Sequence, residues 1–235
     1  MQPYFLPYIG YYQLMHSVDV FVVYDDIKYT KKGWINRNRF LMQGKPAYMT
    51  LPLAKGSDYL DIRERMLSDD YANDAMVISR RLQNAYNSCD FRSQGLELVN
   101  RIFAIDKLNL FEFLYESIVV TIERLQLDVT LIKSSEVVKK SEHTGQDRVI
   151  EICRALDASA YVNPIGGLEL YDPVAFEKAG IDLQFHEMKH FRYSQPSESF
   201  VSHLSIIDSV MCVGFAKTAC FVATEYRLIR KHHAI

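Results

Sequence analysis

The chain has 235 residues, of which 49% are hydrophobic, and this is enough for one sizeable hydrophobic core. Its 27 Lys and Arg residues nearly balance 29 Asp and Glu residues, which argues against nucleic acid, and DNA in particular, as the main partner. There is neither a signal peptide nor an apolar run that we expect to span a membrane, so the sequence predicts a cytoplasmic protein without membrane insertion.

The four cysteines form no Cys-x-x-Cys pair, so we do not expect a zinc site. Cys153, Cys212 and Cys220 lie in apolar helical patterns, which are typical of buried free thiols.

A turn at Pro7 and Gly10 opens a predicted short helix at 11–17. The next segment, 19–26, is apolar and β-branched and predicts a buried strand that ends in two aspartates. A strand should also precede the turn, but Met1 directly precedes Gln2-Pro3, and we therefore expect a few residues to be missing before Met1.

The next predicted elements are short strands at 47–53 and 60–63, separated by a turn at Gly56 and Ser57. Apolar residues at helical spacing predict helices at 71–86 and 110–127. We therefore expect one domain over 1–235 that contains a mostly helical subdomain at 70–127.

Strands and helices then alternate, which predicts right-handed βαβ units and a parallel sheet, that is, an α/β fold. The predicted strands are 128–132, 160–162 and 181–185, and the predicted helices are 146–156 and 171–178. Two closing helices are expected at 199–213 and 216–230, where the cations Arg227, Arg230 and Lys231, together with His232 and His233, would favour a helix carboxyl end.

Polar residues gather after the strand at 19–26. Asp25 and Asp26 could bind Mg²⁺ or accept hydrogen bonds from sugar hydroxyls, or they could be a solvated strand end. The cations that follow suit phosphate groups, although a basic loop is an alternative. Trp34, Asn36 and Asn38 are interleaved with Arg37, and this favours specific recognition; the cations are Lys31, Lys32, Arg37 and Arg39.

Three further segments could contact a ligand, and each has a structural alternative. Tyr8-Ile9-Gly10-Tyr11 could let the backbone approach an anion, or it could be a packed turn. Asn163 to Gly167, with Gly166 inside it and Tyr171 after it, follows a predicted strand as a ligand loop or a simple turn.

In the third segment, Ser205 and Asp208 share a predicted helix face and could contact substrate or cap the helix. His186 could act as a general base. His186 and His190 have no third ligand in register, so we do not expect a metal site.

Together these residues resemble the WbqC-like family, which occurs among bacterial genes for O-antigen and other surface polysaccharides. The resemblance rests on Gln2-Pro3-x-x-x-Pro7-x-x-Gly10-Tyr11, Asp19-Val20-Phe21, Asp25, Trp34-x-Asn36-Arg37-Asn38, Tyr193-x-Gln195, Leu204 to Asp208 and Gly214. It implies that an acyl or aminoacyl group, such as glycine, is added to an amino sugar or sugar nucleotide.

Tyr8 to Tyr11 is also similar, more distantly, to the His-x-Gly-His turn of nucleotidylyltransferases and pantothenate synthetases, with tyrosine in place of both histidines. This likeness implies a Rossmann-like (HUP-type) parallel sheet flanked by helices, with ATP and Mg²⁺ as cofactors. Tyrosine carries no positive charge, so Arg37 or Lys32 would have to supply it.

From these resemblances we expect roles for the motif residues of this sequence. The expected catalytic residues are Arg37, Asp25 and Asp208. The expected cofactor-binding residues are Gln2, Pro3, Tyr8, Gly10, Tyr11, Trp34, Asn36 and Asn38. The expected substrate-binding residues are Asn163, Gly166, Tyr171, Tyr193, Gln195 and Ser205.

Three functions fit the sequence. The first is an enzyme that acylates an amino sugar, through an acyl-adenylate if ATP is used. The second is a non-catalytic protein that binds a nucleotide or nucleotide sugar, which the replaced histidines favour. The third is a transferase that takes its group from an aminoacyl-tRNA, for which the basic segment from Lys28 to Arg39 could provide a local contact.

Overall fold

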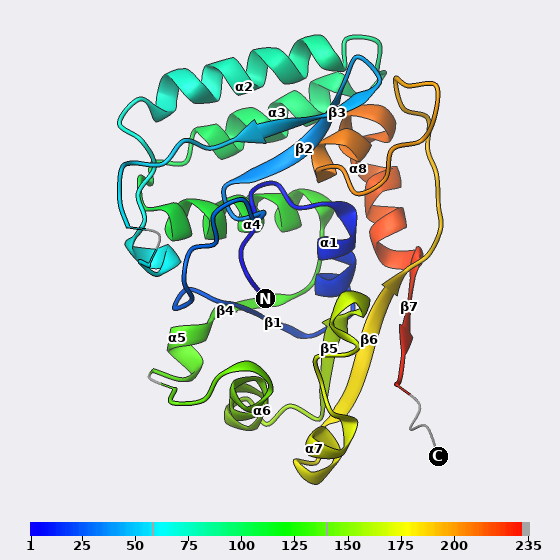
Figure 1. Cartoon of the computed structure of the whole chain (residues 1–235). Helices are drawn as coiled ribbons and strands as arrows, with labels where there is room; N and C mark the ends of the chain where they lie inside the picture. Colours follow the sequence, from blue (N-terminus) through cyan, green and yellow to red (C-terminus); the bar gives the residue numbers. More distant parts are fainter. Residues whose placement is uncertain (58, 140, 232–235) are drawn as a thin grey trace.

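The computed structural model describes residues 1–57, 59–139 and 141–231. It is an α/β fold with parallel strands flanked by helices, as the sequence predicted (Figure 1). Strands β1 (Val20–Val23) and β4 (Thr130–Lys133) pair in parallel, and a second sheet has the order β5 (Ala160–Pro164), β6 (Asp182–Met188) and β7 (Tyr226–Ile229).

The position of the expected first strand is taken by Met1. Its backbone nitrogen donates to the Val22 carbonyl at 2.6 Å, and its carbonyl accepts from the Tyr24 N–H at 2.9 Å. This is the hydrogen-bond pattern of a parallel neighbour. The segment that follows Met1 therefore leaves from the same edge as the end of β1, which is compatible with a HUP-type arrangement.

The second sheet combines a parallel and an antiparallel pair. β5 and β6 are parallel, whereas β7 runs antiparallel to β6. The prediction of a helix to residue 230 is therefore wrong in its last part. Arg227 and Arg230 do not end a helix: Arg227 pairs with Glu187, its partner in the β7 register, and Arg230, directly after β7, pairs with Asp182.

β2 (Arg37–Met42) and β3 (Lys45–Thr50) form a β-hairpin. The predicted strand at 47–53 overlaps β3, but β2 was not predicted, because the segment before Phe40 resembled a ligand loop. Gln43 and Gly44 both have positive φ values, of 50° and 74°, which matches the tight turn that joins such strands. The predicted strand at 60–63 is wrong, because Ile62–Glu64 forms a short 3₁₀ helix, η1, which begins with an Asp61–Glu64 capping box.

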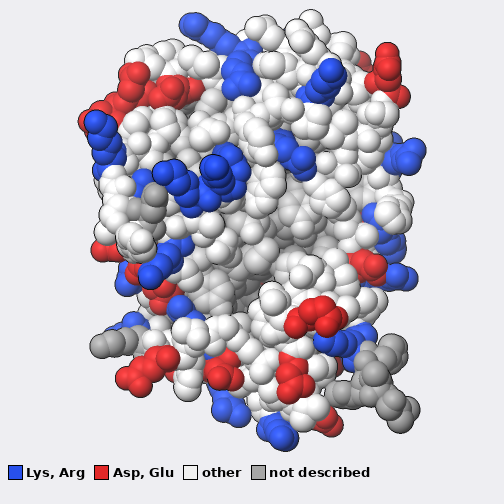
Figure 2. All heavy atoms as spheres, viewed as in Figure 1, with Lys and Arg blue, Asp and Glu red and all other residues white. Residues whose placement is uncertain are grey.

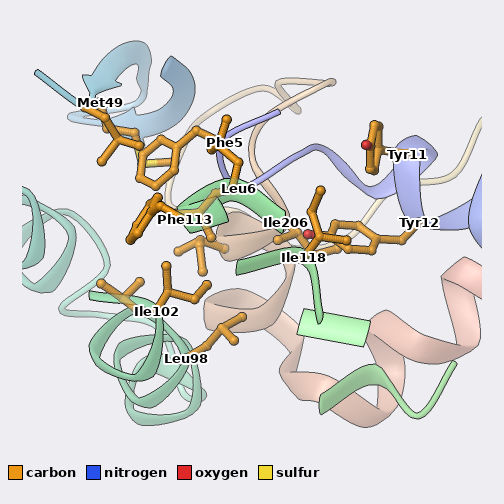
Figure 3. Packing of buried hydrophobic residues seen from close by; sticks show 14 of the residues in the cluster. Phe5, Leu6, Tyr11, Tyr12, Met49, Leu98, Ile102, Phe113, Ile118 and Ile206 are labelled. Atoms are coloured by element: carbon orange, nitrogen blue, oxygen red, sulfur yellow. The ribbon is translucent and has the colours of Figure 1, made fainter. Parts of the chain in front are cut away.

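Helices α2 (Tyr71–Ala85) and α4 (Leu110–Leu125) confirm the predicted helices, and α3 (Arg92–Phe103) lies between them. Their buried side chains share one hydrophobic cluster with Phe5 and Leu6 (Figure 3). A separate subdomain at 70–127 stays a prediction. The remaining helices of the first three quarters are α1 (Ile9–His16), α5 (Ser134–Val137), α6 (Gly145–Ala155), η2 (Ile165–Gly167) and α7 (Pro173–Lys178).

Helix α8 (Ile206–Thr224) is interrupted at Gly214, where φ is 78° and ψ is 169°. The break between two closing helices is therefore confirmed, but the first begins at Ile206 and not at residue 199. By length and composition α8 could cross a membrane, which the sequence analysis did not anticipate. Half of this stretch is buried inside the fold, as is usual for a core helix of a soluble protein.

Three of the four thiols are shielded, and this predicts their order of reactivity. Cys220 is exposed, so the prediction that it is buried is wrong. Burial raises the pKa of the Cys153 thiol to about 11, and it also raises the pKa values of Cys89 and Cys212, whose sulfur atoms lie 3.6 Å apart. A two-unit rise leaves roughly a hundredfold less of the reactive thiolate at neutral pH.

We expect Cys220 to be alkylated first by iodoacetamide at pH 7.5, which peptide mass spectrometry at several times will measure. In urea all four cysteines should react at similar rates. Modification of Cys153 in the folded protein as fast as Cys220 would contradict the buried placement.

Candidate functional site

The first group of polar residues lies at the carboxyl ends of β1 and β4. Asp25 is buried, and its Oδ1 accepts from the Ser134 hydroxyl at 2.8 Å and from the Ser135 N–H at 3.0 Å. Its Oδ2 accepts from the Ser135 hydroxyl at 2.6 Å, and Arg63 lies 4.0 Å away. The parallel pairing of the strands brings these side chains together, because Ser134 directly follows β4.

Asp26 and Arg148 form a half-buried ion pair beside this group. Their atoms Oδ2 and Nη2 are 2.5 Å apart, and their side chains are 14% and 15% exposed. Burial alone would raise the pKa of Asp26, but hydrogen bonds from Ser134 and Arg148 outweigh it and lower this pKa. The Arg148 guanidinium lies over the Tyr24 ring, 5.1 Å from its centroid, and its buried Nε has no partner among the described residues.

Tyrosine side chains extend this group to the end of β5. The Tyr161 hydroxyl donates to Asn163 Oδ1 at 3.0 Å and lies 3.4 Å from the Tyr171 hydroxyl. Burial raises the pKa of Tyr24 to about 12 and raises the pKa of Tyr161 well above its usual value, with the neighbouring Tyr171 adding to both shifts. Tyr24 and Tyr161 therefore stay neutral at physiological pH and can donate hydrogen bonds.

The loop after β5 is fitted around Asn163. Its Nδ2 donates to the Pro164 carbonyl at 2.9 Å, and a Cβ on Gly167 would lie only 2.0 Å from the same nitrogen. Gly167 is thus required for close approach, whereas the space beside Gly166 is open within 4 Å. Two of the three predicted substrate contacts in this region, Asn163 and Tyr171, lie beside Tyr161.

The loop after Met1 is held in a strained shape. Leu6 has a φ of 43°, which is rare for a residue with a side chain. Asn38 on β2 stabilises this shape, because its Nδ2 donates to the carbonyls of Phe5 at 3.0 Å and Leu6 at 2.8 Å. The Tyr11 hydroxyl donates to the Gln2 carbonyl at 3.0 Å, so Tyr11 also supports this loop.

Tyr8 covers Gly10 at the start of α1. A Cβ on Gly10 would lie 2.4 Å from the Tyr8 ring, so glycine is what lets the ring lie there. Tyr8 also pairs with Ser205 through a backbone bridge, and its ring centroid is 5.6 Å from that of His203. Burial and the nearby Tyr4 raise the pKa of Tyr8, so its phenol stays neutral.

The side chains of the Trp34 to Arg39 motif form a buried set and an outer set, which alternate along β2 from Arg37 onward. The side chains of Asn36 and Asn38 point inward and are buried; Asn36 accepts from the Tyr29 hydroxyl at 2.9 Å and donates to the Leu51 carbonyl at 2.8 Å. Trp34 and Arg37 lie on the outer side. Arg37 donates to the carbonyls of Gly33 and Lys32, and its guanidinium lies over the Tyr48 ring.

Asp208 forms a separate buried cluster at the start of α8. It accepts from the hydroxyls of Tyr86 at 2.7 Å and Tyr193 at 2.6 Å, and from Gln195 Nε2 at 2.6 Å. Burial raises the pKa of Asp208, and the three donors counteract this rise in part. Ser205 caps the helix, because its hydroxyl accepts from the Ile207 N–H.

The structure thus places the predicted site residues in three groups. Asp25, Asn163 and Tyr171 lie at the strand ends, Tyr193, Gln195 and Asp208 form the buried cluster, and Trp34 and Arg37 are on the hairpin. Within the described ranges, the three predicted catalytic residues, Asp25, Arg37 and Asp208, share no hydrogen-bond partner. Their roles, and those of Gln2, Pro3 and the other motif residues, stay predictions.

Two other places are less suited to chemistry. His186 is buried against Tyr226, and burial lowers its pKa to about 4, so it is neutral at physiological pH. A surface pocket of about 390 Å³ at the α8 break has mainly apolar walls, which include Phe91, Val213 and Phe215. Across residues 1–57, 59–139 and 141–231, no group of three or more His, Cys, Asp or Glu is arranged to hold a metal ion.

We call the polar and tyrosine residues at the carboxyl ends of β1, β4 and β5 the strand-end group, and sequence reasoning missed several of them. Ser134 and Ser135 lie within three residues of the end of the strand predicted at 128–132, and their position could have marked them. Tyr24 lies between the first strand and Asp25, where it is easily counted as part of the strand. Arg148 and Tyr161 carry no local signal, because only the packing of α6 and β5 brings them to this edge.

The fold and this group of residues define an α/β protein with polar and tyrosine side chains at the carboxyl ends of its parallel strands. Residues 2–220 match the model of the WbqC-like protein family, and the chain belongs to this family. It is 25% identical over 217 residues to "Uncharacterized protein Rv1507c" of Mycobacterium tuberculosis (strain ATCC 25618 / H37Rv), covering 91% of this chain and 92% of that protein. No solved structure matches the chain significantly.

Proposed function

We propose that the chain is a cytoplasmic transferase or ligase that attaches an acyl or aminoacyl group to an amino sugar or sugar nucleotide in bacterial surface-polysaccharide synthesis. The sugar is bound within the strand-end group, by Tyr24, Asp26, Arg148, Tyr161 and Tyr171. In the reaction the amine nitrogen attacks the acyl carbonyl carbon, a C–N bond forms, the bond to the donor's leaving group breaks, and the amine loses a proton.

The observation that carries this proposal is that neutral tyrosines lie beside the Asp26–Arg148 ion pair at the strand ends. Neutral phenol hydroxyls donate and accept hydrogen bonds, as sugar hydroxyls do, and the rings offer flat apolar surface. Arg148 places a cation beside these hydroxyls, and its buried Nε has no hydrogen-bond partner among the described residues. Asp26 is ionised at neutral pH and can accept from a sugar hydroxyl or ammonium group.

The residues present do not fit a resident Mg²⁺ ion. Each carboxylate oxygen of Asp25 and Asp26 already accepts a hydrogen bond: both oxygens of Asp25 from Ser135, and those of Asp26 from Ser134 and Arg148. Mg²⁺ prefers carboxylate oxygens that are free to coordinate it in a near-octahedral set. We therefore derive no step through this ion, and the use of ATP rests on the resemblance alone.

A binding assay tests the sugar site directly. Purified protein is titrated with a panel of nucleotide-linked amino sugars by isothermal calorimetry, and we expect at least one to bind. Tyr161→Phe removes only the hydroxyl, and we expect it to weaken that binding about five- to tenfold, as the loss of a buried hydrogen bond does. Tyr59→Phe is the matched control, because Tyr59 is 82% exposed, and it should change nothing.

Turnover separates the transferase from a silent binding protein. The ligand found by calorimetry is incubated with glycine, ATP and Mg²⁺, or with glycyl-tRNA, and amide formation is followed by mass spectrometry. Binding without product under both conditions would favour the non-catalytic alternative, which the tyrosines at positions 8 and 11 support. If Tyr161→Phe and the unaltered protein bound the sugar with equal affinity, the sugar would not be bound at the strand-end group.

A further inference from the structure

The β2–β3 hairpin and the loop before it carry a charge very different from that of the rest of the chain. Residues 27–57 contain seven Lys and Arg residues and neither Asp nor Glu, although the whole protein has a net charge of −2. Figure 2 shows a group of Lys and Arg side chains over the start of β2, above a hollow in the middle of this face. The near-neutral overall charge therefore hides a local basic surface.

Exposed aromatic rings lie among these cations. Trp34 and Tyr48 are 36% and 49% exposed, and their rings are stacked at an angle of 26° with centroids 6.4 Å apart. The guanidinium of Arg37 lies 4.7 Å from the Tyr48 centroid, and that of Arg39 lies 5.4 Å from the Trp34 centroid. We call these four side chains the hairpin face.

Strand geometry explains why three members of the hairpin face, Arg37, Arg39 and Tyr48, point outward; Trp34 precedes β2 and stacks on Tyr48. Arg37 and Arg39 alternate with the buried Asn38 and Phe40, and Tyr48 lies opposite Arg39 in the antiparallel register. Asn38 and Phe40 already fill the core on the inner side, so packing does not require the side chains on the outer side. Large rings in such an exposed position indicate a surface that is covered in function.

Basic side chains interleaved with exposed aromatic rings suit one kind of ligand in particular. Single-stranded nucleic acids present phosphates to Lys and Arg and flat bases to aromatic rings. A duplex hides its bases and would leave Trp34 and Tyr48 uncovered. We propose that the hairpin face, flanked by Lys31 and Lys32, binds single-stranded RNA, with a base stacked on Trp34 or Tyr48 and phosphates paired with the cations.

The hairpin face also adjoins the loop after Met1. Arg39 Nη2 donates to the His203 carbonyl at 3.3 Å, and the His203 ring lies beside Tyr8. An RNA end bound on the hairpin face would lie next to the hollow in the middle of the molecular surface that Figure 2 shows. This step rests on the proposed function: the acyl donor of the transferase would arrive attached to RNA.

Trp34 is the one tryptophan in the sequence, so its fluorescence reports on the hairpin face alone. The probe is a twelve-nucleotide unstructured RNA, and binding is measured by tryptophan quenching and by anisotropy of a labelled copy. We expect quenching on binding, and an affinity that falls linearly on a log–log plot as salt rises. Trp34→Ala should weaken binding, measured by anisotropy, about tenfold or more.

Two charge variants show whether the effect is local. Arg37→Gln should weaken binding and reduce the salt dependence, whereas Arg101→Gln, on α3, should leave both unchanged. Circular dichroism and thermal melting of each variant establish that it is folded. Tyr48→Ala provides a second test of stacking should Trp34→Ala melt at a lower temperature.

Three results would overturn the proposal. One is the absence of RNA binding at micromolar protein in low salt. Another is binding that Trp34→Ala and Tyr48→Ala do not weaken. The third is equal binding of a polyphosphate chain without bases, which would mean that charge alone acts. None of these measurements depends on turnover, so the RNA site and the transferase activity can fail separately.

Discussion

Replacing Asp208 with alanine is expected to lower the free energy of unfolding by about 3 to 5 kcal/mol, because it leaves buried donors without their shared acceptor. Tyr86, Tyr193 and Gln195 all donate to this carboxylate, and Asp208 is fully buried. Urea denaturation followed by circular dichroism will measure the loss. The segment around Tyr193 should also become sensitive to protease, since its anchor to α8 is gone.

Asp208→Asn is the matched comparison, because it keeps the shape and one acceptor oxygen, and it should cost less than alanine. The dependence on pH adds a second test. Burial raises the pKa of Asp208 in the folded protein, so its contribution to stability is complete below the unfolded value of about 4 and is lost as the pH rises through the folded value. The advantage of the natural protein over Asp208→Asn should therefore shrink from acid to neutral pH; a growing advantage would contradict the raised pKa.

Replacing Asn38 with aspartate is expected to release the loop after Met1. The Asn38 amide donates to the carbonyls of Phe5 and Leu6, and a carboxylate in its place would face both oxygens with no proton to offer. We expect a loss of at least about 3 kcal/mol in the free energy of unfolding. Faster amide hydrogen exchange at residues 4–8 will show where the structure opens.

The comparison with Asn38→Ala separates repulsion from simple loss of the hydrogen bonds. Alanine removes the donors without adding charge, so it should be less harmful than aspartate at pH 7. Protonation restores a donor to the aspartate variant, so the gap between the two should narrow in acid. If both variants matched the natural protein in exchange and stability, Asn38 would not be what holds Leu6 at its positive φ.

The elements that could be predicted from sequence are those that depend on local patterns. Apolar spacing located α2 and α4, and a β-branched run located β1; α6, β5 and β6 were also predicted near their observed positions. Their alternation was sufficient for the parallel α/β architecture, which the structure confirms. The break at Gly214 was also visible, because glycine in an apolar helical run is a common interruption.

The elements that failed depend on partners distant in sequence. Tyr226–Ile229 is equally compatible with the end of a helix, and only pairing with β6 makes it a strand. The alternation in β2 was hidden, because Arg and Asn at successive positions have no apolar contrast. Arg148 and Tyr161 could not be assigned to the candidate site, since their neighbours Asp26 and Tyr171 come from other elements.

The two sides of β2 have a consequence for how this protein can change. Asn38 and Phe40 of β2 serve the interior, whereas Arg37 and Arg39 of β2 and the preceding Trp34 lie on the outside, within a stretch of seven residues. Substitutions at the outer positions can therefore alter what the surface recognises while the architecture persists. Relatives that keep the two asparagines but differ at these outer positions should fold alike and choose different partners, and a designer could redirect the protein by the same route.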